Sequence, residues 1–431
     1  MRATRGRFDG LMGGVLALAI VGCTDDSEPQ GEGTEGTTGE SSSTTSVGET
    51  PDTLEPDSTA APSEGGSETT EGSETDTEGA GDSLEGSCPG VELLPRPFDT
   101  AARGPWAVGA RTVDLDGLTV EVWYPARDPE AGVEPVVYDI RDSLPLSEQD
   151  KISDEDNPWQ PCDCYRDLPI DDTHGPYPVI LFVHGTAGFS TQSLPHMVHW
   201  ASRGFVVMAA DHPGLWLADL LGIACGNGMV PQDLQGDLAT MLDAVRGDVG
   251  GLEDFGDRLD GERIGAAGHS AGGSVVSMLG DEAAVVIPMA AGGVGDGSAL
   301  ESTLVLGAMS DSVVAFSSQV DGYDASPAPK RLVGIANTGH LAFSQMCALQ
   351  NAAGDSLLEI AQANGVCGAA LAGGLFQCDD SFTPDPDSWD IVHFASSAVL
   401  EQTLHCEPEA VADLGLIQGR YPVVLEFRED L

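Results

Sequence analysis

Short apolar runs recur between residues 177 and 336, and they alternate with segments whose apolar residues are spaced three or four apart. The runs show little polar alternation, which is typical of parallel strands buried on both faces. They lie at residues 177–183, 205–210, 263–267, 283–289, 303–307 and 330–336, and we expect 330–336 to be the last strand. Helices are predicted at residues 194–203, 233–248, 271–279 and 390–406. This alternation predicts a mostly parallel, doubly wound α/β sheet.

An antiparallel hairpin is expected before the first parallel strand. Residues 111–124 alternate between apolar and polar positions on both sides of Asp116-Gly117. An Asp-Gly pair flanked in this way is a strong signal for a two-residue hairpin turn. The following segment, 126–176, is polar and rich in proline, so we expect it to run over the surface.

Residues 1–23 have the pattern of a secretory signal. Three arginines precede an apolar run at residues 11–21, which is too short to span a membrane. The run ends in Gly22-Cys23 and resembles the lipobox of bacterial lipoproteins. The resemblance implies lipidation of Cys23 and export to the cell envelope, with attachment to the membrane through acyl chains only. Thr24, in place of an aspartate, favours the outer membrane over the inner one, and plain secretion is the alternative.

Composition divides the remaining chain into two parts. Residues 24–87 consist mainly of Ser, Thr, Gly, Glu, Asp and Pro, so they cannot bury enough apolar surface to offset the entropy of ordering. We therefore expect a disordered acidic tether. Residues 88–431 are long enough for one large α/β domain, with a cysteine-containing insertion and tail at 341–431.

Acidic residues dominate the chain and exclude several partners. There are 70 acidic and 18 basic residues, for a formal net charge of −52. Such a field disfavours nucleic acid, anionic membrane surfaces and anionic substrates.

Eight cysteines follow Cys23, and an even number in an exported domain predicts disulfides whose pairing the spacing leaves open. Cys162-Asp163-Cys164 lacks a second ligand pair of the kind that zinc sites use, so no metal is expected.

One pentapeptide carries the main chemical signal. Gly268-His269-Ser270-Ala271-Gly272 fits the G-x-S-x-G pattern of a nucleophile placed on a sharp turn between a strand and a helix. The flanking sequence agrees, because a predicted strand ends at 267 and a predicted helix begins at 271. Small residues are needed where the two backbones pass too closely for a Cβ atom. Ser270 is therefore the candidate nucleophile.

A serine nucleophile needs a base and an acid that orients the base. Asp311 follows the strand predicted at 303–307, and His340 follows the strand predicted at 330–336. The order serine, acid, histidine is that of the α/β-hydrolases. Rival acids do not directly follow a predicted strand, and rival histidines end earlier strands or lie on a late helix; they are Asp296, Asp321, Asp324, His184, His212 and His393.

The backbone N–H groups of Thr186 and Ala271 are the candidate donors to a developing oxyanion. Such donors come from the residue after the nucleophile and from the turn after an earlier strand. His184 precedes that turn, so we interpret it as support for the turn and not as a base.

These motifs together resemble the dienelactone-hydrolase-like branch of the α/β-hydrolases, which includes the platelet-activating-factor acetylhydrolases. The resemblance covers about residues 104–345 and rests on residues 122–125, 184–186, 204–213, 268–273, Asp311 and Gly339-His340. It implies an α/β-hydrolase fold and hydrolysis of small or polymeric esters through an acyl-enzyme, without a cofactor. The stretch from Cys347 to Cys378 has no place in the family pattern, and we expect it to form a wall of the pocket.

Two other functions use the same features. A catalytically inactive module that binds surfaces could retain the fold, and an acyltransferase or lipase could use the same triad. The sequence alone does not identify the substrate.

Overall fold

The computed structural model describes residues 83–431, apart from 248, 374–377 and 380. The signal segment predicted at 1–23 and the tether predicted at 24–87 lie outside the described residues, except for 83–87. There, Ser83–Leu84 (β1) pairs with Arg96–Pro97 (β2). Among the described residues, no helix has both the length and the apolar character needed to cross a membrane.

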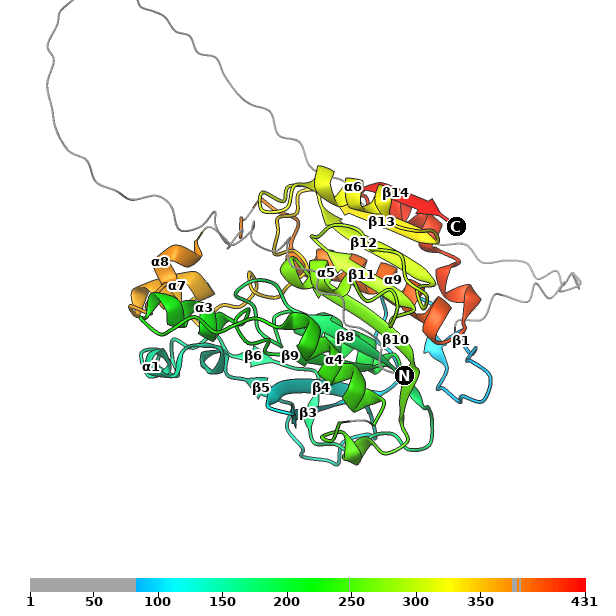
Figure 1. The fold of residues 1–431 in the computed structure, drawn as a ribbon, viewed down its shortest axis with the longest axis horizontal. Helices are drawn as coiled ribbons and strands as arrows, with labels where there is room; N and C mark the ends of the chain where they lie inside the picture. Colours follow the sequence, from blue (N-terminus) through cyan, green and yellow to red (C-terminus); the bar gives the residue numbers. More distant parts are fainter. Residues whose placement is uncertain (1–82, 248, 374–377, 380) are drawn as a thin grey trace, which may run out of the picture. The chain divides into compact units, whose positions relative to one another are not determined.

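The described chain forms an α/β fold around one large sheet (Figure 1). Its ten strands lie in the order β14-β13-β12-β11-β10-β8-β9-β4-β3-β7. They are β3 (Ala107–Leu115), β4 (Leu118–Ala126), β7 (Tyr165–Arg166), β8 (Tyr177–Val183), β9 (Val206–Ala210), β10 (Leu259–His269), β11 (Val285–Met289), β12 (Ser302–Ala308), β13 (Lys330–Ile335) and β14 (Val424–Asp430). Six neighbouring strands at the centre are mutually parallel; they are β13, β12, β11, β10, β8 and β9.

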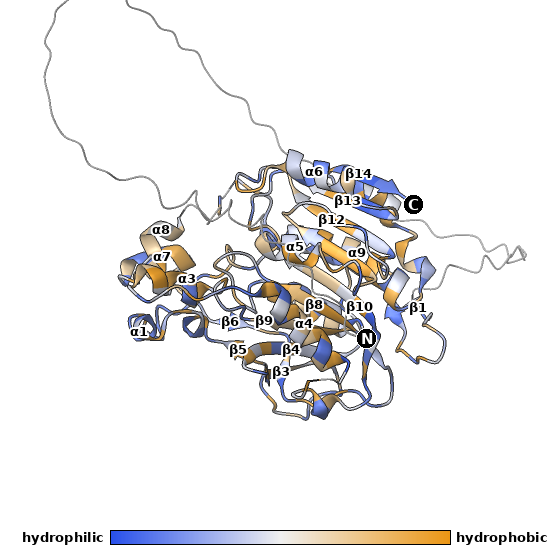
Figure 2. Ribbon diagram, viewed as in Figure 1, coloured by the Kyte–Doolittle hydropathy of each residue, from blue (hydrophilic) through white to orange (hydrophobic). Residues whose placement is uncertain are grey.

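The edges of the sheet are partly antiparallel. β3 and β4 form the expected hairpin, with Leu115 opposite Leu118 and with positive φ angles of 53° at Asp116 and 90° at Gly117. The expectation that 330–336 is the last strand is wrong, because β14 pairs antiparallel with β13. β14 has charged residues along much of its length and appears hydrophilic in Figure 2, so it lacks the apolar run that marks the central strands.

Helices cover both faces of the sheet. They are α1 (Leu146–Gln149), α2 (Leu194–Ser202), α3 (Leu217–Ala224), α4 (Leu234–Val245), α5 (Ala271–Val276), α6 (Phe316–Ala325), α7 (Leu357–Ala363), α8 (Ala369–Ala372), α9 (Asp385–Leu404) and α10 (Ile417–Arg420). Short 3-10 turns lie at Ile140–Ser143, Glu253–Phe255, Pro408–Val411 and Leu414–Leu416. The Asp233 side chain accepts a bond from the N–H of Gly236 and begins α4.

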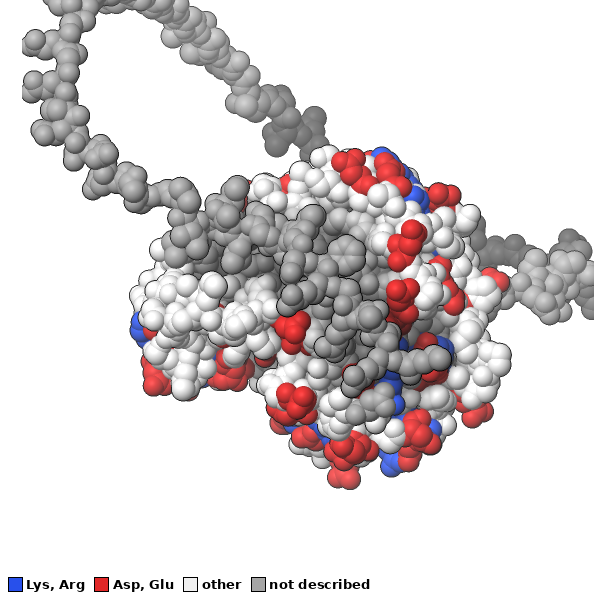
Figure 3. Space-filling view, viewed as in Figure 1, with Lys and Arg blue, Asp and Glu red and all other residues white. Residues whose placement is uncertain are grey.

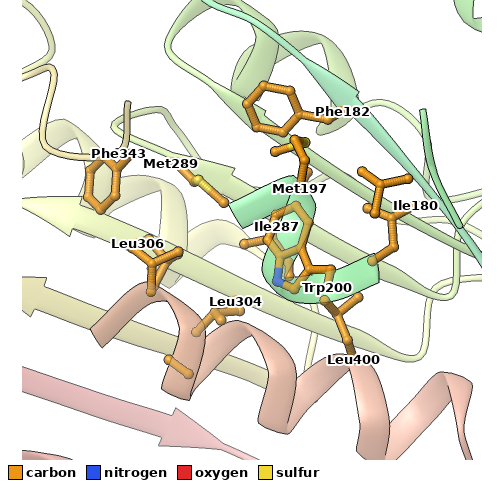
Figure 4. Close-up of a cluster of buried hydrophobic side chains, with 14 of the residues drawn as sticks. Ile180, Phe182, Met197, Trp200, Ile287, Met289, Leu304, Leu306, Phe343 and Leu400 are labelled. Carbon is orange, nitrogen blue, oxygen red and sulfur yellow. The ribbon is translucent and has the colours of Figure 1, made fainter. Parts of the chain in front are cut away.

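Two apolar cores lie on opposite faces of the central strands. Alternate residues of a strand point to opposite faces, so Ile180 and Phe182 belong to one core whereas Val179 and Leu181 belong to the other. The first core is closed by α2 and α9 and the second by α4 and α5. Figure 4 shows the first core, where Met197 and Trp200 of α2 and Leu400 of α9 meet Ile180, Phe182, Ile287 and Leu304.

The polar segment between β4 and β8 is only partly a surface excursion. It contains α1 and a small pairing of β5 (Val137–Tyr138) with β6 (Gln160–Pro161). Its strand β7 then joins the main sheet next to β3.

Four disulfides join the eight cysteines of the domain. The pairs are Cys88–Cys406, Cys162–Cys164, Cys225–Cys367 and Cys347–Cys378. The prediction that these cysteines form disulfides is thereby confirmed, and the pairs supply the connectivity that the spacing left open.

The strand order reverses its direction at β8. The chain passes from β8 to β9 on one side of β8 and then to β10 on the other side. In open parallel sheets, ligands bind at such a switch point, outside the carboxyl ends of the strands. The turn with Thr186 follows β8, and Ser270 follows β10.

Candidate active site

Ser270 lies at the junction of β10 and α5, with φ 56° and ψ −119°. A positive φ is uncommon for a residue other than glycine and has to be held by its surroundings. A Cβ atom on Gly268 would lie 2.6 Å from the carbonyl oxygen of Gly272. A Cβ atom on Gly272 would lie 2.1 Å from the carbonyl oxygen of Val183. Both positions therefore require glycine, as the sequence predicts, and the turn leaves the Ser270 side chain partly exposed.

The structure brings Ser270, His340 and Asp311 together. The Nε2 atom of His340 lies 2.8 Å from Oγ of Ser270, and its Nδ1 atom lies 2.8 Å from Oδ2 of Asp311. His340 comes from the turn after β13 and Asp311 from the turn after β12. Both residues are buried, at 4% and 8% exposure. The imidazole therefore bridges a hydroxyl and a carboxylate at the carboxyl ends of three parallel strands.

The Asp311 carboxylate is held by donors on its other side. Its Oδ1 atom accepts bonds from the backbone N–H groups of Val313 and Val314, at 2.8 and 2.9 Å. An ionised carboxylate only accepts hydrogen bonds, so Nδ1 of His340 carries the proton that it donates to Oδ2. This tautomer leaves the lone pair of Nε2 facing Ser270, which is the arrangement a general base needs.

Gln319 also contacts Asp311, and sequence reasoning missed it. This buried residue lies on α6, and its Nε2 atom donates to Oδ2 of Asp311 at 3.2 Å and to the carbonyl oxygen of Val314 at 2.7 Å. Its Oε1 atom accepts a bond from the N–H of Ala308 at 3.1 Å. Gln319 thus ties the acid to the end of β12. No sequence motif marks it, because its role depends on how α6 returns over the strand.

His269, the variable residue of the pentapeptide, holds the backbone of His340. Its Nε2 atom donates to the carbonyl oxygen of His340 at 2.7 Å, and its Nδ1 atom accepts from Nε2 of Gln192 at 3.3 Å. Burial, and next the neighbouring His340, lower the pKa of His269 to about 3. His269 is therefore neutral at physiological pH and has both ring nitrogens occupied.

Gln192 extends this network to the turn after β8. Its Oε1 atom accepts a bond from the N–H of Gly185 at 3.2 Å, while its amide nitrogen contacts His269. The side chain is 1% exposed. One amide therefore connects the turn with Thr186 to the residue that holds His340.

The turn after β8 lies against the serine. A Cβ atom on Gly185 would lie 3.3 Å from Cβ of Ser270. The turn is closed by a bond from the N–H of Gly188 to the carbonyl oxygen of Gly185. Thr186 and Ala271 are both partly exposed, and within the described residues neither backbone N–H donates to a protein group. Ala271 is the first residue of α5, where an N–H has no partner inside the helix.

His184 has both ring nitrogens occupied by the backbone. Its Nδ1 atom donates to the carbonyl oxygen of Gly185 at 2.8 Å, and its Nε2 atom accepts from the N–H of His212 at 3.2 Å. Burial, and next the neighbouring His212, lower the pKa of His184 to about 3. His184 thus links the ends of β8 and β9, in agreement with the prediction that it supports the turn.

The other rival residues have different surroundings. His212 contacts Oδ2 of Asp237 through Nδ1 at 3.0 Å, and the ring of His393 stacks on that of His199 with centroids 4.0 Å apart. The three rival acids are exposed, whereas Asp311 is buried; they are Asp296, Asp321 and Asp324.

One group of possible metal ligands occurs among the described residues. Ligand atoms of Glu148, Cys225 and Cys367 lie within 4.8 Å of one another. Cys225 and Cys367 form a disulfide, and cysteine binds metal as a free thiolate. Cys162 and Cys164 also form a disulfide. None of these four cysteines is therefore a free thiolate that could bind a metal ion.

Comparison with known proteins places the chain in no family. No protein-family model matches it, and a search of curated proteins gives no match.

Proposed function

We propose that this protein is a serine hydrolase that cleaves carboxylic esters through an acyl-enzyme. The observation that carries the proposal is the pair of 2.8 Å contacts that His340 makes with Ser270 and Asp311. A hydroxyl next to an oriented imidazole is the arrangement that activates a serine. The strained turn at Ser270 supports the same function. So do the N–H groups of Thr186 and Ala271, which have no acceptor within the described residues.

In the acylation step, Oγ of Ser270 bonds to the ester carbonyl carbon while its proton passes to Nε2 of His340. Asp311 stabilises the imidazolium that forms. Collapse of the tetrahedral intermediate breaks the bond to the alcohol oxygen, and His340 returns the proton to the leaving alcohol.

In the deacylation step, water takes the place of the alcohol. His340 accepts a proton from water as the water oxygen bonds to the acyl carbon. The bond to Oγ then breaks, His340 returns the proton to Ser270, and the carboxylic acid leaves. These steps use side chains and water alone, and they restore the starting protonation states.

The negative charge on the carbonyl oxygen needs donors in both steps. Ala271 directly follows Ser270, and Thr186 follows Gly185, whose Cβ position lies 3.3 Å from Cβ of Ser270. Neither N–H group has a protein acceptor among the described residues. One such donor typically stabilises the transition state by about 3 kcal/mol. We assign these two N–H groups to the oxyanion.

The assignment of an α/β-hydrolase fold is part of the same proposal. A serine on a turn between strand and helix, followed along the chain by an acid and a histidine, is the arrangement of the α/β-hydrolase fold. The sheet with its switch point between β8 and β10 supports this assignment, and the sequence resemblance favours the dienelactone-hydrolase-like branch. The net charge of −52 favours neutral esters over anionic ones. Lipidation of Cys23 would hold the enzyme at the cell envelope.

The test is hydrolysis of p-nitrophenyl acetate and butyrate by the chain and by the Ser270→Ala variant. Loss of the nucleophile should lower turnover by on the order of 10⁴- to 10⁶-fold. Equal rates in the two proteins would contradict the assignment of Ser270 as the nucleophile. Formation of a new ester when an alcohol is added would identify acyl transfer, and a complete lack of turnover would favour the surface-binding module.

A further inference from the structure

The oxyanion of the proposed reaction develops in an unfavourable electrostatic field. The chain has 70 acidic and 18 basic residues, and Figure 3 shows Asp and Glu spread over the described surface with few Lys and Arg between them. Such a field disfavours a developing negative charge on the substrate. Stabilisation of the oxyanion therefore depends on local donors, and hence on how accurately the N–H of Thr186 is aligned.

The N–H of Thr186 shares a peptide unit with the carbonyl group of Gly185. This unit is trans, and the N–H and C=O groups of a planar trans peptide point in opposite directions. The Gly185 carbonyl oxygen accepts bonds from Nδ1 of His184 at 2.8 Å and from the N–H of Gly188 at 2.9 Å. These two donors fix the direction of the carbonyl group and therefore that of the Thr186 N–H.

Gln192 fixes the other peptide unit of Gly185. Its Oε1 atom accepts a bond from the N–H of Gly185 at 3.2 Å. Glycine has the largest backbone freedom of any residue, so Gly185 needs a partner on each side to keep one conformation. Gln192 supplies the partner for its N–H, and His184 supplies the partner for its carbonyl group.

Close packing keeps the Gln192 amide in place. A Cβ atom on Gly188 would lie 2.2 Å from Oε1 of Gln192, and a Cβ atom on Gly185 would lie 2.8 Å from Nδ1 of His269. The amide and the ring of His269 therefore lie directly against the turn. Gln192 is 1% exposed, so its amide bonds to protein groups and not to bulk solvent.

The nitrogen of the same amide leads to the base. Nε2 of Gln192 donates to Nδ1 of His269 at 3.3 Å, and Nε2 of His269 donates to the carbonyl oxygen of His340 at 2.7 Å. The next residue, Ser193, donates from Oγ to the carbonyl oxygen of Phe343 at 2.8 Å. The segment after β8 is thus joined to the segment that contains His340.

We propose that Gln192 is a positioning residue that aligns the oxyanion donor of Thr186 and couples its position to that of His340. The inference rests on the proposed esterase function and adds to it a residue outside the triad. Gln192 acts through Gly185 on one side and through His269 on the other. It serves the step in which Oγ of Ser270 bonds to the carbonyl carbon, the proton passes to His340, and negative charge develops on the carbonyl oxygen.

The first test is the effect of Gln192→Met on the hydrolysis of p-nitrophenyl acetate. The variant keeps a side chain of similar length and loses both polar groups of the amide. Loss of a whole oxyanion donor costs about 100- to 1,000-fold in kcat, so misalignment of one should lower kcat by about 10- to 100-fold. KM should change little, because the donor acts mainly in the transition state. An unchanged kcat would overturn the inference.

Trifluoroacetone distinguishes a misaligned donor from a general loss of stability. Oγ of Ser270 bonds to the ketone carbon, its proton passes to Nε2 of His340, and the adduct carries its negative charge on the former carbonyl oxygen. Because this adduct resembles the tetrahedral intermediate, its inhibition constant should rise by the factor by which Gln192→Met lowers kcat/KM. A lower kcat/KM with an unchanged inhibition constant would overturn the inference.

Gln160→Met is the matched control. Gln160 is also a buried glutamine, and its amide bonds to the carbonyl oxygen and to Oγ1 of Thr191 at 2.8 and 2.7 Å. Within the described residues it bonds neither to Gly185 nor to His269. Gln160→Met should lower the melting temperature about as much as Gln192→Met and keep the parent kcat. Equal losses of kcat in the two variants would overturn the inference.

Gln192→Glu is the conservative variant and preserves the packing of the site. Burial favours the neutral form of a carboxyl group, and a neutral carboxyl group can accept from Gly185 and donate to His269. In mildly acidic buffer Gln192→Glu should therefore have a higher kcat than Gln192→Met. The difference should disappear as the pH rises and the carboxyl group ionises. Equal kcat values for the two variants at every pH would overturn the inference.

The double variant of Gln192→Met and His269→Phe tests the coupling. Because these side chains are bonded to each other, the double variant should lose less kcat than the product of the two single losses. Gln192→Met and Gln319→Met, whose side chains bond to different residues, should give multiplicative losses. Multiplicative losses for Gln192 and His269 would overturn the coupling.

Failure of this inference is distinguishable from failure of the proposed function. A parent chain that hydrolyses the ester, with none of these effects in the Gln192 variants, would overturn the role of Gln192 alone. A parent chain that neither hydrolyses the ester nor binds trifluoroacetone would overturn the esterase function, and the role of Gln192 with it.

Discussion

The ring of His269 donates a hydrogen bond from Nε2 to the carbonyl oxygen of His340 over 2.7 Å. The residue next to the candidate nucleophile therefore fixes the backbone of the candidate base. Since β10 carries His269 and Ser270 side by side, one strand end positions both reacting partners. We interpret His269 as a positioning residue that acts through His340.

Replacement of His269 by phenylalanine should lower kcat far more than it changes KM. The variant keeps a ring but loses the donor, so His340 can move away from Ser270. Misplacement of a catalytic group by about 1 Å can cost about 100-fold. Steady-state kinetics with p-nitrophenyl esters measure the effect, and His269→Gln, which retains an N–H donor, should recover part of the rate.

His405→Phe is the matched control for this prediction. His405 is also a buried histidine that bonds to a carbonyl oxygen, that of Gly204 at 3.2 Å. Gly204 precedes β9, so this contact lies at the amino end of the strand and away from the carboxyl ends that carry the triad. The variant should keep the parent kcat. An equal loss of kcat in both variants would mean that His269 acts only through general stability.

Gln319→Met should leave the Asp311 carboxylate less firmly held in its position beside His340. The variant keeps the volume but removes the amide that bonds to Asp311, Ala308 and Val314. Leaving buried polar groups unpaired costs about 1–3 kcal/mol of stability. We expect a lower melting temperature and a fall in kcat smaller than that of Asp311→Asn, for which about 10⁴-fold is expected. Gln319→Met with unchanged kcat would show that the backbone N–H groups alone hold the acid.

Buried histidines should make the fold sensitive to acid. Burial lowers the pKa of His184 and His269 to about 3 and holds that of His405 well below its usual range. An unfolded histidine takes up its proton near pH 6.5, so below that pH the unfolded state binds more protons. The free energy of unfolding contributed by these groups is present above pH 6.5 and is lost as the pH falls towards 3.

His405→Phe isolates one such contribution from the repulsion among the many carboxylates. Below pH 6.5 the free energy of unfolding of the variant should fall less steeply than that of the parent chain, by up to about 1.4 kcal/mol per pH unit. Urea unfolding at a series of pH values measures the two slopes. Parallel slopes would contradict a neutral buried His405.

Removal of the Cys225–Cys367 disulfide should destabilise the domain more than removal of Cys162–Cys164. The first pair is separated by 142 residues and the second by 2. A cross-link restricts the unfolded chain more when it closes a longer loop. We expect a loss of about 4 kcal/mol for the double serine variant of the first pair and less than half of that for the second. Denaturant unfolding of the two variants gives the comparison, and an inverse ranking would contradict it.

The sequence predicts the parts of the site that have local signals. Ser270 lies in a motif, and Asp311 and His340 directly follow apolar strands, so their approach follows from the parallel sheet. Gln319, Gln192 and His269 have no such signal, because each acts through a contact made by tertiary packing.

The same distinction applies to the fold. The central strands have apolar runs and were predictable, whereas β14 carries charges that suit an edge strand and lacks such a run. The disulfide pairs depend on how distant segments meet. An apolar pocket between α3 and α7 is formed by residues more than 100 positions apart in the chain.

The central claim is that Ser270 is a nucleophile activated by His340. A fluorophosphonate forms a bond from Oγ to phosphorus and releases fluoride when it meets such a serine. Intact-mass spectrometry should show one added phosphonyl group per chain, peptide mapping should place it on Ser270, and Ser270→Ala and His340→Ala should remain unmodified. A chain that stays unmodified, or one that is modified equally after Ser270→Ala, would contradict the account.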